Sequence, residues 1–348
     1  MSTAKIQIRD LTKVFGAKPE RALALLREGV PKDEIFQRTG QVVGLSGVNF
    51  DVQAGEIYVL MGLSGSGKST LIRLINRLVE PTSGAVIVDG EDVVKMPAAE
   101  LVRWRRKRVA MVFQSFALMP HRTVFDNVAF GLEVAGEKVR HYQDKVMGVL
   151  EQVGLKAYAR KYPRQLSGGM QQRVGLARAL AVDPEVMLMD EAFSALDPLK
   201  RTEMQDLMLD LQRVQRRTIL FVSHDLEEAF KIGSRIGIME GGTLVQEGTP
   251  HEIITRPAND YVRRFFKGVD TSRYLTAADL VDCAEPLADL VARCNGTRLS
   301  ATTTLPDALR TVLGLDQPVS VFDNAERLVG CITPKSLLTK IASTRHAS

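Results

Sequence analysis

The stretch GLSGSGKST, from Gly62 to Thr70, decides the fold expected for this chain of 348 residues. It matches G-x-x-x-x-G-K-[S/T], the pattern of a loop that binds the phosphates of a nucleotide. The apolar run EIYVLM precedes it and predicts a buried strand. After it, apolar residues recur at the spacing of one helix face: Leu71, Leu74, Ile75 and Leu78. A strand, a glycine-rich turn and a helix in this order are the context that the pattern requires.

The residue types of this loop suit phosphate groups. Backbone N–H groups from Gly62 to Ser69 can point inward around an anion, and the start of the following helix adds a favourable dipole. Lys68 supplies a positive charge to the β- and γ-phosphates, and Ser69 offers a hydroxyl to Mg²⁺. We therefore expect the nucleotide to contact eight residues of the loop: Gly62, Ser64, Gly65, Ser66, Gly67, Lys68, Ser69 and Thr70.

The bulk composition is that of a soluble globular protein. Hydrophobic residues make up 45% of the chain and charged residues 25%. No apolar run approaches the ~18 residues that a membrane span needs. The N-terminal MSTAKIQIRD lacks the apolar segment of a signal peptide. The sequence therefore predicts a cytosolic protein unless a partner holds it at a membrane.

Two further features are given no chemistry from the sequence. The densest basic run is RWRRKR, residues 103–108, in a chain of net charge +5. A solvated surface is favoured there over contact with anionic lipid, and nothing beside the run favours nucleic acid. Cys283, Cys294 and Cys331 form no C-x-x-C pair, and their odd number suits reduced thiols.

Strands and helices alternate after the loop. The runs VMLMD and TILFV read as buried strands, Leu199 to Arg213 as a helix, and GIMEGGTLVQEG as a hairpin that turns on Gly241-Gly242. This alternation predicts an α/β fold with a mainly parallel sheet. A nucleotide should then lie beyond the carboxyl ends of the strands.

Two segments differ from this alternation. Residues 17–41 read as two short helices broken near Gly29-Val30-Pro31. Near the other end, FFKGVDTSRYLTAADL reads as a linker, and a helix–strand–strand–helix pattern follows it. We place a boundary near Gly268, which gives domains of residues 1–267 and 268–348.

Four side chains are expected at the carboxyl edge of the sheet. Asp190 closes one strand and can hold Mg²⁺, directly or through water. Glu191 follows it, and a second carboxylate beside a γ-phosphate can orient or deprotonate a water. Gln114 also ends a strand and can reach that water or Mg²⁺, unless it is a surface glutamine. His224 can reach the γ-phosphate, with a structural histidine as the alternative.

The stretch LSGGMQQRVGLARAL, residues 166–180, contains a second helix start that suits an anion. Ser167, Gly168 and Gly169 open this helix. A chain with one phosphate-binding loop needs no second helix start that binds phosphate. We therefore expect this helix start to contact the nucleotide bound by another copy of the chain. A helix that simply begins with a serine cap is the alternative for this stretch alone.

In chain order the sequence contains GLSGSGKST, Gln114, LSGGM, VMLMDE, SALD and His224. This set resembles the ATPase subunit of ABC transporters over residues 5–265. The resemblance implies a P-loop NTPase of the ABC cassette type, with a RecA-like core and a helical subdomain at about residues 116–175. It also implies ATP and Mg²⁺ as cofactors.

In that family the matching residues have assigned roles. The resemblance implies that Lys68, Ser69 and Asp190 hold MgATP and that Glu191 is the catalytic base. It implies that Gln114 contacts the metal, senses the γ-phosphate and couples the site to the membrane subunit.

The resemblance extends to the dimer interface and to the adenine. It implies that His224 is the switch histidine, that Ser167, Gly168 and Gly169 clamp the partner's ATP, and that Asp197 lies at the dimer seam. Phe15, in LTKVFG, matches the aromatic residue that stacks on adenine, with a core phenylalanine as the alternative.

The substrate class is narrowed by a further resemblance. The insertion at residues 17–41, together with MGLSGSGKST, resembles that of importers of glycine betaine, proline betaine or choline. PVSVFDNAERLVGCITPKSLLTKI resembles half of a cystathionine-β-synthase-type (CBS) module, which implies a small α+β CBS-like domain in the tail. Since such modules work in pairs, we expect two tails to meet across a dimer.

These resemblances imply a peripheral ATPase at the cytoplasmic face of a bacterial membrane. Its expected partners are a second copy in an ATP-sandwich homodimer, separate permease subunits and, indirectly, a substrate-binding protein, with no nucleic acid. The expected cargo is choline or a related quaternary amine such as glycine betaine. A soluble ABC ATPase that acts on ribosomes or nucleic acid is the alternative.

Overall fold

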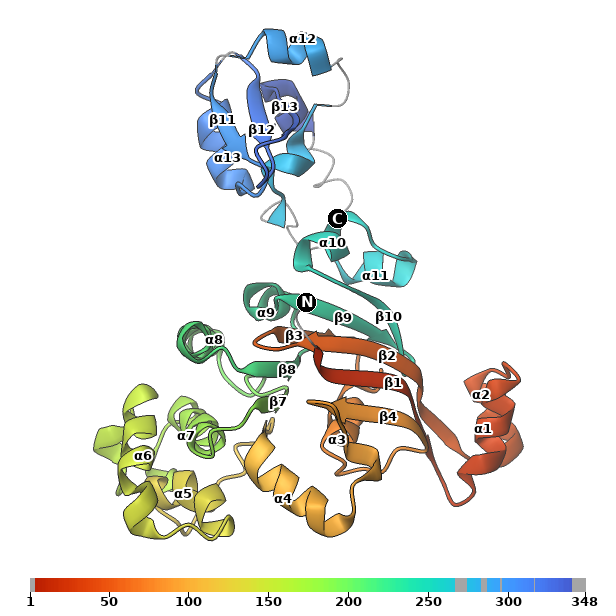
Figure 1. Ribbon diagram of the computed structural model, residues 1–348, viewed down its shortest axis with the longest axis vertical. Coiled ribbons are helices and arrows are strands. Elements are labelled where there is room, and N and C mark those ends of the chain that lie inside the picture. Colours follow the sequence, from red (N-terminus) through yellow and green to blue (C-terminus); the bar gives the residue numbers. More distant parts are fainter. Residues whose placement is uncertain (1–3, 267–273, 283–286, 295, 316, 340–348) are drawn as a thin grey trace. The chain divides into compact units, whose positions relative to one another are not determined.

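The computed structural model describes residues 4–266, 274–282, 287–294, 296–315 and 317–339 (Figure 1). Residue contacts divide the chain into two units, Met1–Thr249 and Pro250–Ser348. Helices α10 (Pro250–Thr255) and α11 (Asp260–Phe265) group with the second unit. The boundary predicted near Gly268 lies outside the described residues and stays a prediction.

The first unit is built on a six-stranded sheet of order β10-β9-β3-β8-β7-β6. All of its neighbouring strands run parallel except β10, which pairs antiparallel with β9. Every residue of β3, β7 and β8 is buried, as in parallel sheets covered on both faces. The predicted α/β fold is therefore confirmed. The strands are β3 (Ile57–Met61), β6 (Val109–Val112), β7 (Val186–Asp190), β8 (Thr218–Val222), β9 (Arg235–Glu240) and β10 (Thr243–Gly248).

The β9–β10 hairpin turns on Gly241 and Gly242, as the sequence predicts. Their φ angles are +52° and +81°. Two successive positive φ angles are what a tight hairpin turn demands, and glycine adopts them without strain.

A second, antiparallel sheet of order β2-β1-β4-β5 also belongs to the first unit, and the sequence patterns do not predict it. Strand β1 lies between β2 and β4 and pairs antiparallel with both. The alternating buried positions Ile6 and Ile8 of β1 face the core. The strands are β1 (Ala4–Phe15), β2 (Val42–Gln53), β4 (Ser83–Val88) and β5 (Glu91–Asp92).

The predicted insertion between β1 and β2 forms two helices, α1 (Pro19–Arg27) and α2 (Lys32–Thr39). The break at Gly29-Val30-Pro31 is confirmed. Ala22 and Ile35 are fully buried in a small apolar cluster with residues of β1 and β2. This cluster holds both helices on the antiparallel sheet.

Helix α3 (Lys68–Ile75) packs its apolar face into the main core of the first unit. Leu71, Leu74 and Ile75 are fully buried, and each such side chain contributes about 1.5–3 kcal/mol. Leu78 was expected on the same face, but it is 52% exposed because the helix ends at Ile75. The chain's single tryptophan, Trp104 of α4 (Ala98–Arg108), lies in the same core.

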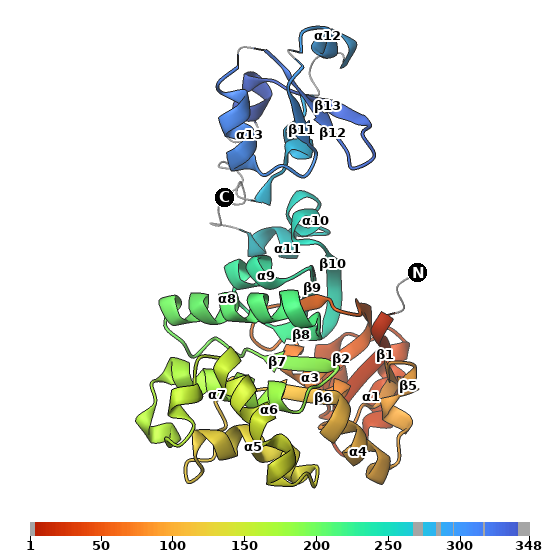
Figure 2. The same ribbon diagram turned by 60° about the vertical axis from the view of Figure 1, so that its left-hand side comes forward.

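Helices fill the segment in which a helical subdomain is predicted. Helices α5, α6 and α7 pack on one another and lie together in both views (Figure 1, Figure 2). The remaining helices of the first unit are α5 (Val124–Val134), α6 (Val139–Gln152), α7 (Gly168–Ala181), α8 (Pro198–Gln215) and α9 (Leu226–Ile232), with short 3₁₀ turns at Val93–Lys95, Lys156–Tyr158 and Pro163–Gln165.

The second unit contains a three-stranded sheet of order β11-β12-β13. The predicted strands and the helix LPDALRTVL are confirmed, and residues 334–339 begin the last predicted helix. The elements are α12 (Leu287–Ala292), β11 (Arg298–Ser300), α13 (Leu305–Val312), β12 (Val319–Phe322) and β13 (Leu328–Ile332), with a 3₁₀ turn at Ala277–Leu280. The linker prediction is wrong for its last part, because Leu275, Ala277 and Leu280 are buried in this unit's core.

Two cysteines of the second unit meet in space. Cys294 Sγ and Cys331 Sγ lie 3.4 Å apart, although 37 positions separate them. Burial and the neighbouring thiol raise the pKa of Cys331 to about 11. The sequence, which shows no C-x-x-C spacing, could not predict this pair. The third cysteine, Cys283, lies outside the described residues.

Candidate functional site

The phosphate-binding loop connects β3 to α3, as the sequence predicts. Two of its glycines lie where no side chain fits. Gly62 has φ +154°, and a Cβ there would collide with the carbonyl oxygen of Met239. Gly67 has φ +99°, and a Cβ there would lie 2.6 Å from Leu45. The loop is thus pressed against its neighbours, with its backbone left open on the side of Gly65, where an added Cβ meets no atom.

Lys68 begins α3, and its side chain reaches back to the loop and is only 5% exposed. Its ammonium group donates to the carbonyl oxygens of Gly62, at 2.7 Å, and of Leu63, at 3.0 Å. Burial lowers the pKa of Lys68, and the carboxylates of Glu191 and Asp190 oppose this shift. The loop therefore holds a buried cation beside the first turn of α3, whose backbone N–H groups have no preceding helical acceptors.

Ser69 and Asp190 form the oxygen-rich part of the site. The Ser69 hydroxyl donates to Asp190 Oδ1 at 2.8 Å. Asp190 is 6% exposed at the end of β7. Arg73 Nη2 lies 3.8 Å from its other oxygen, a neighbour that sequence reasoning missed. The available signal was its position four residues after Ser69, which places both side chains on one face of the helix.

Side chains that follow three strands, β6, β7 and β8, meet at Glu191. Its Oε2 lies 3.2 Å from His224 Nδ1, after β8, and 3.4 Å from Gln114 Nε2, after β6. Its backbone has φ +47°, a conformation that costs a non-glycine residue about 1–2 kcal/mol. Hydrogen bonds hold this conformation, because Glu191 N donates to Val222 O at 3.1 Å and Ser194 Oγ donates to Glu191 O at 2.9 Å.

The second helix start lies outside this cluster. Ser167 caps α7 by accepting from Met170 N at 3.4 Å, and Ser167 and Gly168 are exposed. Asp197 caps α8 in the same way, through Lys200 N at 3.0 Å. Within the described part of the chain, no hydrogen bond or ion pair joins residues 167–169 or Asp197 to the phosphate loop.

Phe15 ends β1 and is 40% exposed. Its ring packs closely on Gly44, where a Cβ would lie 2.7 Å from a ring carbon. Lys13 Nζ lies 5.0 Å from the ring centroid. The ring is therefore no core phenylalanine, and its role in stacking on adenine stays a prediction.

The sequence also missed an ion pair beside His224. Arg201 Nη1 lies 2.7 Å from Asp225 Oδ2 and connects α8 with the loop after β8. Asp225 also caps α9 through Glu228 N at 3.1 Å. The aspartate that follows the histidine in FVSHD was the available signal, since aspartate is a preferred helix cap.

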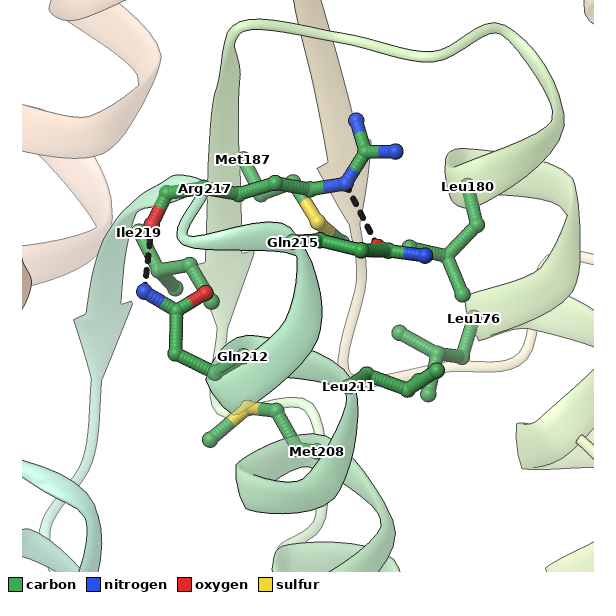
Figure 3. A pocket seen from close by; sticks show the side chains of 9 residues that line it. All are labelled: Leu176, Leu180, Met187, Met208, Leu211, Gln212, Gln215, Arg217 and Ile219. Atoms are coloured by element: carbon green, nitrogen blue, oxygen red, sulfur yellow. Dashed lines mark hydrogen bonds between the residues drawn. The ribbon is translucent and has the colours of Figure 1, made fainter. Parts of the chain in front are cut away.

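A small cavity between α7, α8 and two strands is no ligand site (Figure 3). Its volume is about 10 Å³, and a cavity of that size holds one water at most. Figure 3 shows hydrogen bonds among the polar residues that line it. The Gln212 amide donates to Arg217 O at 2.7 Å, and Arg217 Nε donates to Gln215 Oε1 at 2.8 Å.

The fold and the cluster around the loop define a P-loop nucleotide hydrolase. Buried Lys68 lies in the loop, Ser69 and Asp190 present oxygens, and Glu191 follows next in the chain. None of the helices in the part of the chain that the structure describes has the length and apolar character of a transmembrane segment.

Comparisons with known proteins extend this class to a family. Residues 45–194 match the family "ABC transporter". The chain is 56% identical to the glycine betaine/proline betaine transport system ATP-binding protein ProV of Escherichia coli, over 79% of this chain and 69% of that protein. It is 47% identical to the glycine betaine transport ATP-binding protein OpuAA of Bacillus subtilis, over 94% and 76%.

Two further matches are a relative that covers almost the whole chain and a solved structure that shares the fold. The trimethylamine N-oxide transport system ATP-binding protein TmoW of Pelagibacter ubique is 40% identical over 99% of both chains. The dimeric cassette MJ0796, in a post-hydrolysis state bound to ADP and Pi, matches with a TM-score of 0.59 and 29% identity, over 70% of this chain and 98% of that one. The chain belongs to the ATP-binding subunits of ABC transporters, which favours the transport reading over a soluble ribosome- or nucleic-acid-directed ATPase.

Proposed function

We propose that two copies of this chain bind two ATP molecules at their interface and hydrolyse them to drive import of a quaternary amine. The observation that carries the proposal is the meeting of Gln114, Glu191 and His224 beside the phosphate loop. The exposed helix start at Ser167 supports the second copy, because it lies apart from this cluster and is suited to an anion.

The residues present suit ATP and Mg²⁺. Glycines at positions 62 and 67, where a Cβ would collide, let the loop backbone close around phosphates. Lys68 supplies the positive charge. The adjacent oxygens of Ser69 and Asp190 are the ligand type that Mg²⁺ prefers, and the Gln114 amide oxygen is a third candidate ligand. When bound, the metal would neutralise charge on the phosphates.

Glu191 is proposed as the base that orients a water toward the γ-phosphate. Gln114 and His224 both contact Oε2 of its carboxylate, which leaves Oε1 available to a water. His224 is more than half exposed, and we propose that it also contacts the γ-phosphate. Positioning of this kind supplies most of the catalysis in phosphoryl transfer.

The role of Glu191 is tested with Glu191→Gln, which keeps the shape of the side chain and removes its basicity. ATP binding should persist, and phosphate release should fall by about 10²–10⁴-fold, the usual contribution of a general base. Glu100→Gln, an exposed carboxylate on α4, is the matched control and should leave turnover unchanged. Near-normal turnover of Glu191→Gln would remove Glu191 from this role.

The partner's ATP is proposed to be clamped by Ser167, Gly168 and Gly169, with Asp197 at the seam. The two helix starts are neighbours, since a Cβ at Gly169 would lie 3.3 Å from the Lys200 side chain. The dimeric cassette structures among the similar proteins support such an arrangement.

The names of the relatives support a proposal for the cargo and for the remaining partners. We propose glycine betaine or a similar quaternary amine, including choline, because ProV and OpuAA are named for glycine betaine transport. TmoW, which matches over the full length, adds trimethylamine N-oxide as a candidate. Separate permease subunits would place the chain at the cytoplasmic face of the membrane, with a substrate-binding protein acting indirectly.

Uptake assays separate these cargoes. Labelled glycine betaine, choline and trimethylamine N-oxide should be offered in turn to cells with and without the gene. Loss of glycine betaine uptake on deletion, with weak competition by excess choline, is the expected result. Unchanged uptake of all three compounds would contradict quaternary amine import.

The second unit is proposed as a regulatory CBS-like domain. Its β12–β13 pair and the helix at residues 334–339 have the strand–strand–helix order of half a CBS module. Such halves work in pairs, so we propose that two copies of residues 268–348 meet across the dimer. Deletion of residues 270–348 should then weaken dimer assembly in analytical ultracentrifugation, and unchanged assembly would contradict the pairing.

A further inference from the structure

The helical insertion contacts the hairpin turn beside the phosphate loop. Lys32, the first residue of α2, donates from its ammonium group to Gly241 O. The same ammonium would lie 2.9 Å from a Cβ at Gly242, so the lysine lies directly over this turn. Residues 209 positions apart are thereby joined.

Hydrogen bonds also join the Gly241-Gly242 turn to the phosphate loop. Gly242 N donates to Ser66 O at 3.0 Å, and Ser46 N donates to Gly242 O at 2.8 Å. At Gly242 a Cβ would collide with the carbonyl oxygen of Gly44. The turn is therefore held by Ser66, Ser46 and Gly44, and a shift of its backbone would also move Ser66.

A second contact joins the same hairpin to the loop. The carbonyl of Met239, near the end of β9, lies so close to Gly62 that only glycine fits there. The hairpin thus supports the loop at Gly62 and at Ser66, on either side of the exposed residues 63–65.

Lys32 is chemically suited to hold the turn. Burial lowers its pKa, and within the described residues its ammonium group forms no ion pair beside the hydrogen bond to Gly241 O. A hydrogen bond from a charged donor is stronger than one between neutral groups. The insertion also has an anchor apart from this bond, because Ala22 and Ile35 pack its helices into an apolar cluster.

We propose that Lys32 is a positioning residue of the nucleotide site: through the Gly241-Gly242 turn it fixes the phosphate loop in its binding conformation. The insertion thereby increases the affinity of the loop for ATP without touching the reacting atoms. This inference rests on the nucleotide site proposed above. A loop that is already ordered loses less free energy to ordering when ATP binds. Loss of the Lys32 bond should therefore weaken ATP affinity and raise KM, and leave kcat unchanged.

Lys32→Met keeps the aliphatic stem and removes the donor. ATP affinity of the full chain, measured by titration with a fluorescent ATP analogue and Mg²⁺, should fall about fivefold or more, the usual lower bound for coupling between sites. The KM for ATP should rise in step, with kcat within about twofold. Lys32→Arg, which keeps a charged donor, should restore most of the affinity. Lys18→Met, an exposed lysine of the same insertion, is the matched control and should bind like the wild type.

Hydrogen exchange in the absence of nucleotide gives an independent readout. Lys32→Met should increase exchange in residues 62–70 and leave α1 unchanged, which also shows that the insertion remains folded. Wild-type affinity and exchange in Lys32→Met would overturn the inference, as would a loss of kcat at constant KM. A wild-type chain that fails to bind ATP would instead contradict the proposed function.

Discussion

Gly62→Ala should destabilise the first unit more than Gly65→Ala, although both glycines lie in one loop. Both have positive φ, +154° and +79°, so an alanine at either costs about 1–3 kcal/mol of backbone strain. At Gly65 the new methyl meets no atom within 4 Å. At Gly62 it would collide with Met239 O and lie 2.5 Å from Ser66 Oγ. Overpacking of this kind adds about 1–3 kcal/mol.

The difference of about 2 kcal/mol can be measured by urea unfolding. Trp104 is the single tryptophan, is 5% exposed, and lies in the core cluster that α3 joins, so its fluorescence reports on the right unit. With a slope of roughly 2–3 kcal/mol per molar urea, the midpoint of Gly62→Ala should lie about 0.7–1 M below that of Gly65→Ala.

The comparison subtracts the backbone strain that both variants share, so the remaining difference reports the collision at Gly62 together with any extra strain from its φ of +154°. Equal midpoints would refute the reasoning and would mean that β9 can shift away from the added methyl group at little cost. A larger loss in Gly65→Ala would refute it as well, since the open side of the loop would then be the constrained one.

Two further predictions concern titrating groups. Burial raises the pKa of Glu228, against hydrogen bonds from Ser223 and Gln205, so the folded state keeps the proton longer and stability falls as pH rises from about 4.5 through the raised pKa. Glu228→Gln should flatten the pH dependence of the urea midpoint above pH 4.5, and a parallel decline in both proteins would contradict this. Burial beside Cys294 raises the pKa of Cys331 from 9.0 to about 11, so the thiolate at pH 8 is ~100-fold scarcer than in the unfolded chain. Alkylation followed by peptide mass spectrometry should be correspondingly slower in the folded protein, and equal rates would argue against the buried position.

The phosphate loop, the buried strands and the hairpin could all be predicted from sequence, because their signals are local. Glycines at fixed spacing, a run of apolar residues and the pair Gly241-Gly242 each specify a backbone conformation over a few positions. The helix after Lys68 was predicted too, but its end was not, since Leu78 fits the apolar spacing and only the packed core shows that it is exposed.

The candidate site was predictable in its parts and less so in its arrangement. Asp190 ends a recognisable strand and Glu191 follows it, and the ends of neighbouring strands could be expected at the same edge of a parallel sheet. The sequence could not show that Gln114 and His224 both approach the same oxygen of Glu191, because that depends on the order β8-β7-β6.

By itself the sequence determined that the chain has a phosphate-binding loop, a parallel α/β sheet and an inserted helix pair, and it predicted the strands and helices that follow near the other end. Only the tertiary structure decided which distant residues meet. It placed Lys32 on Gly241 and Cys294 beside Cys331. The physical reason is that periodicity and turn chemistry act over a few residues. Contacts across 37 or 209 positions arise from sheet order and close packing, which no local pattern encodes.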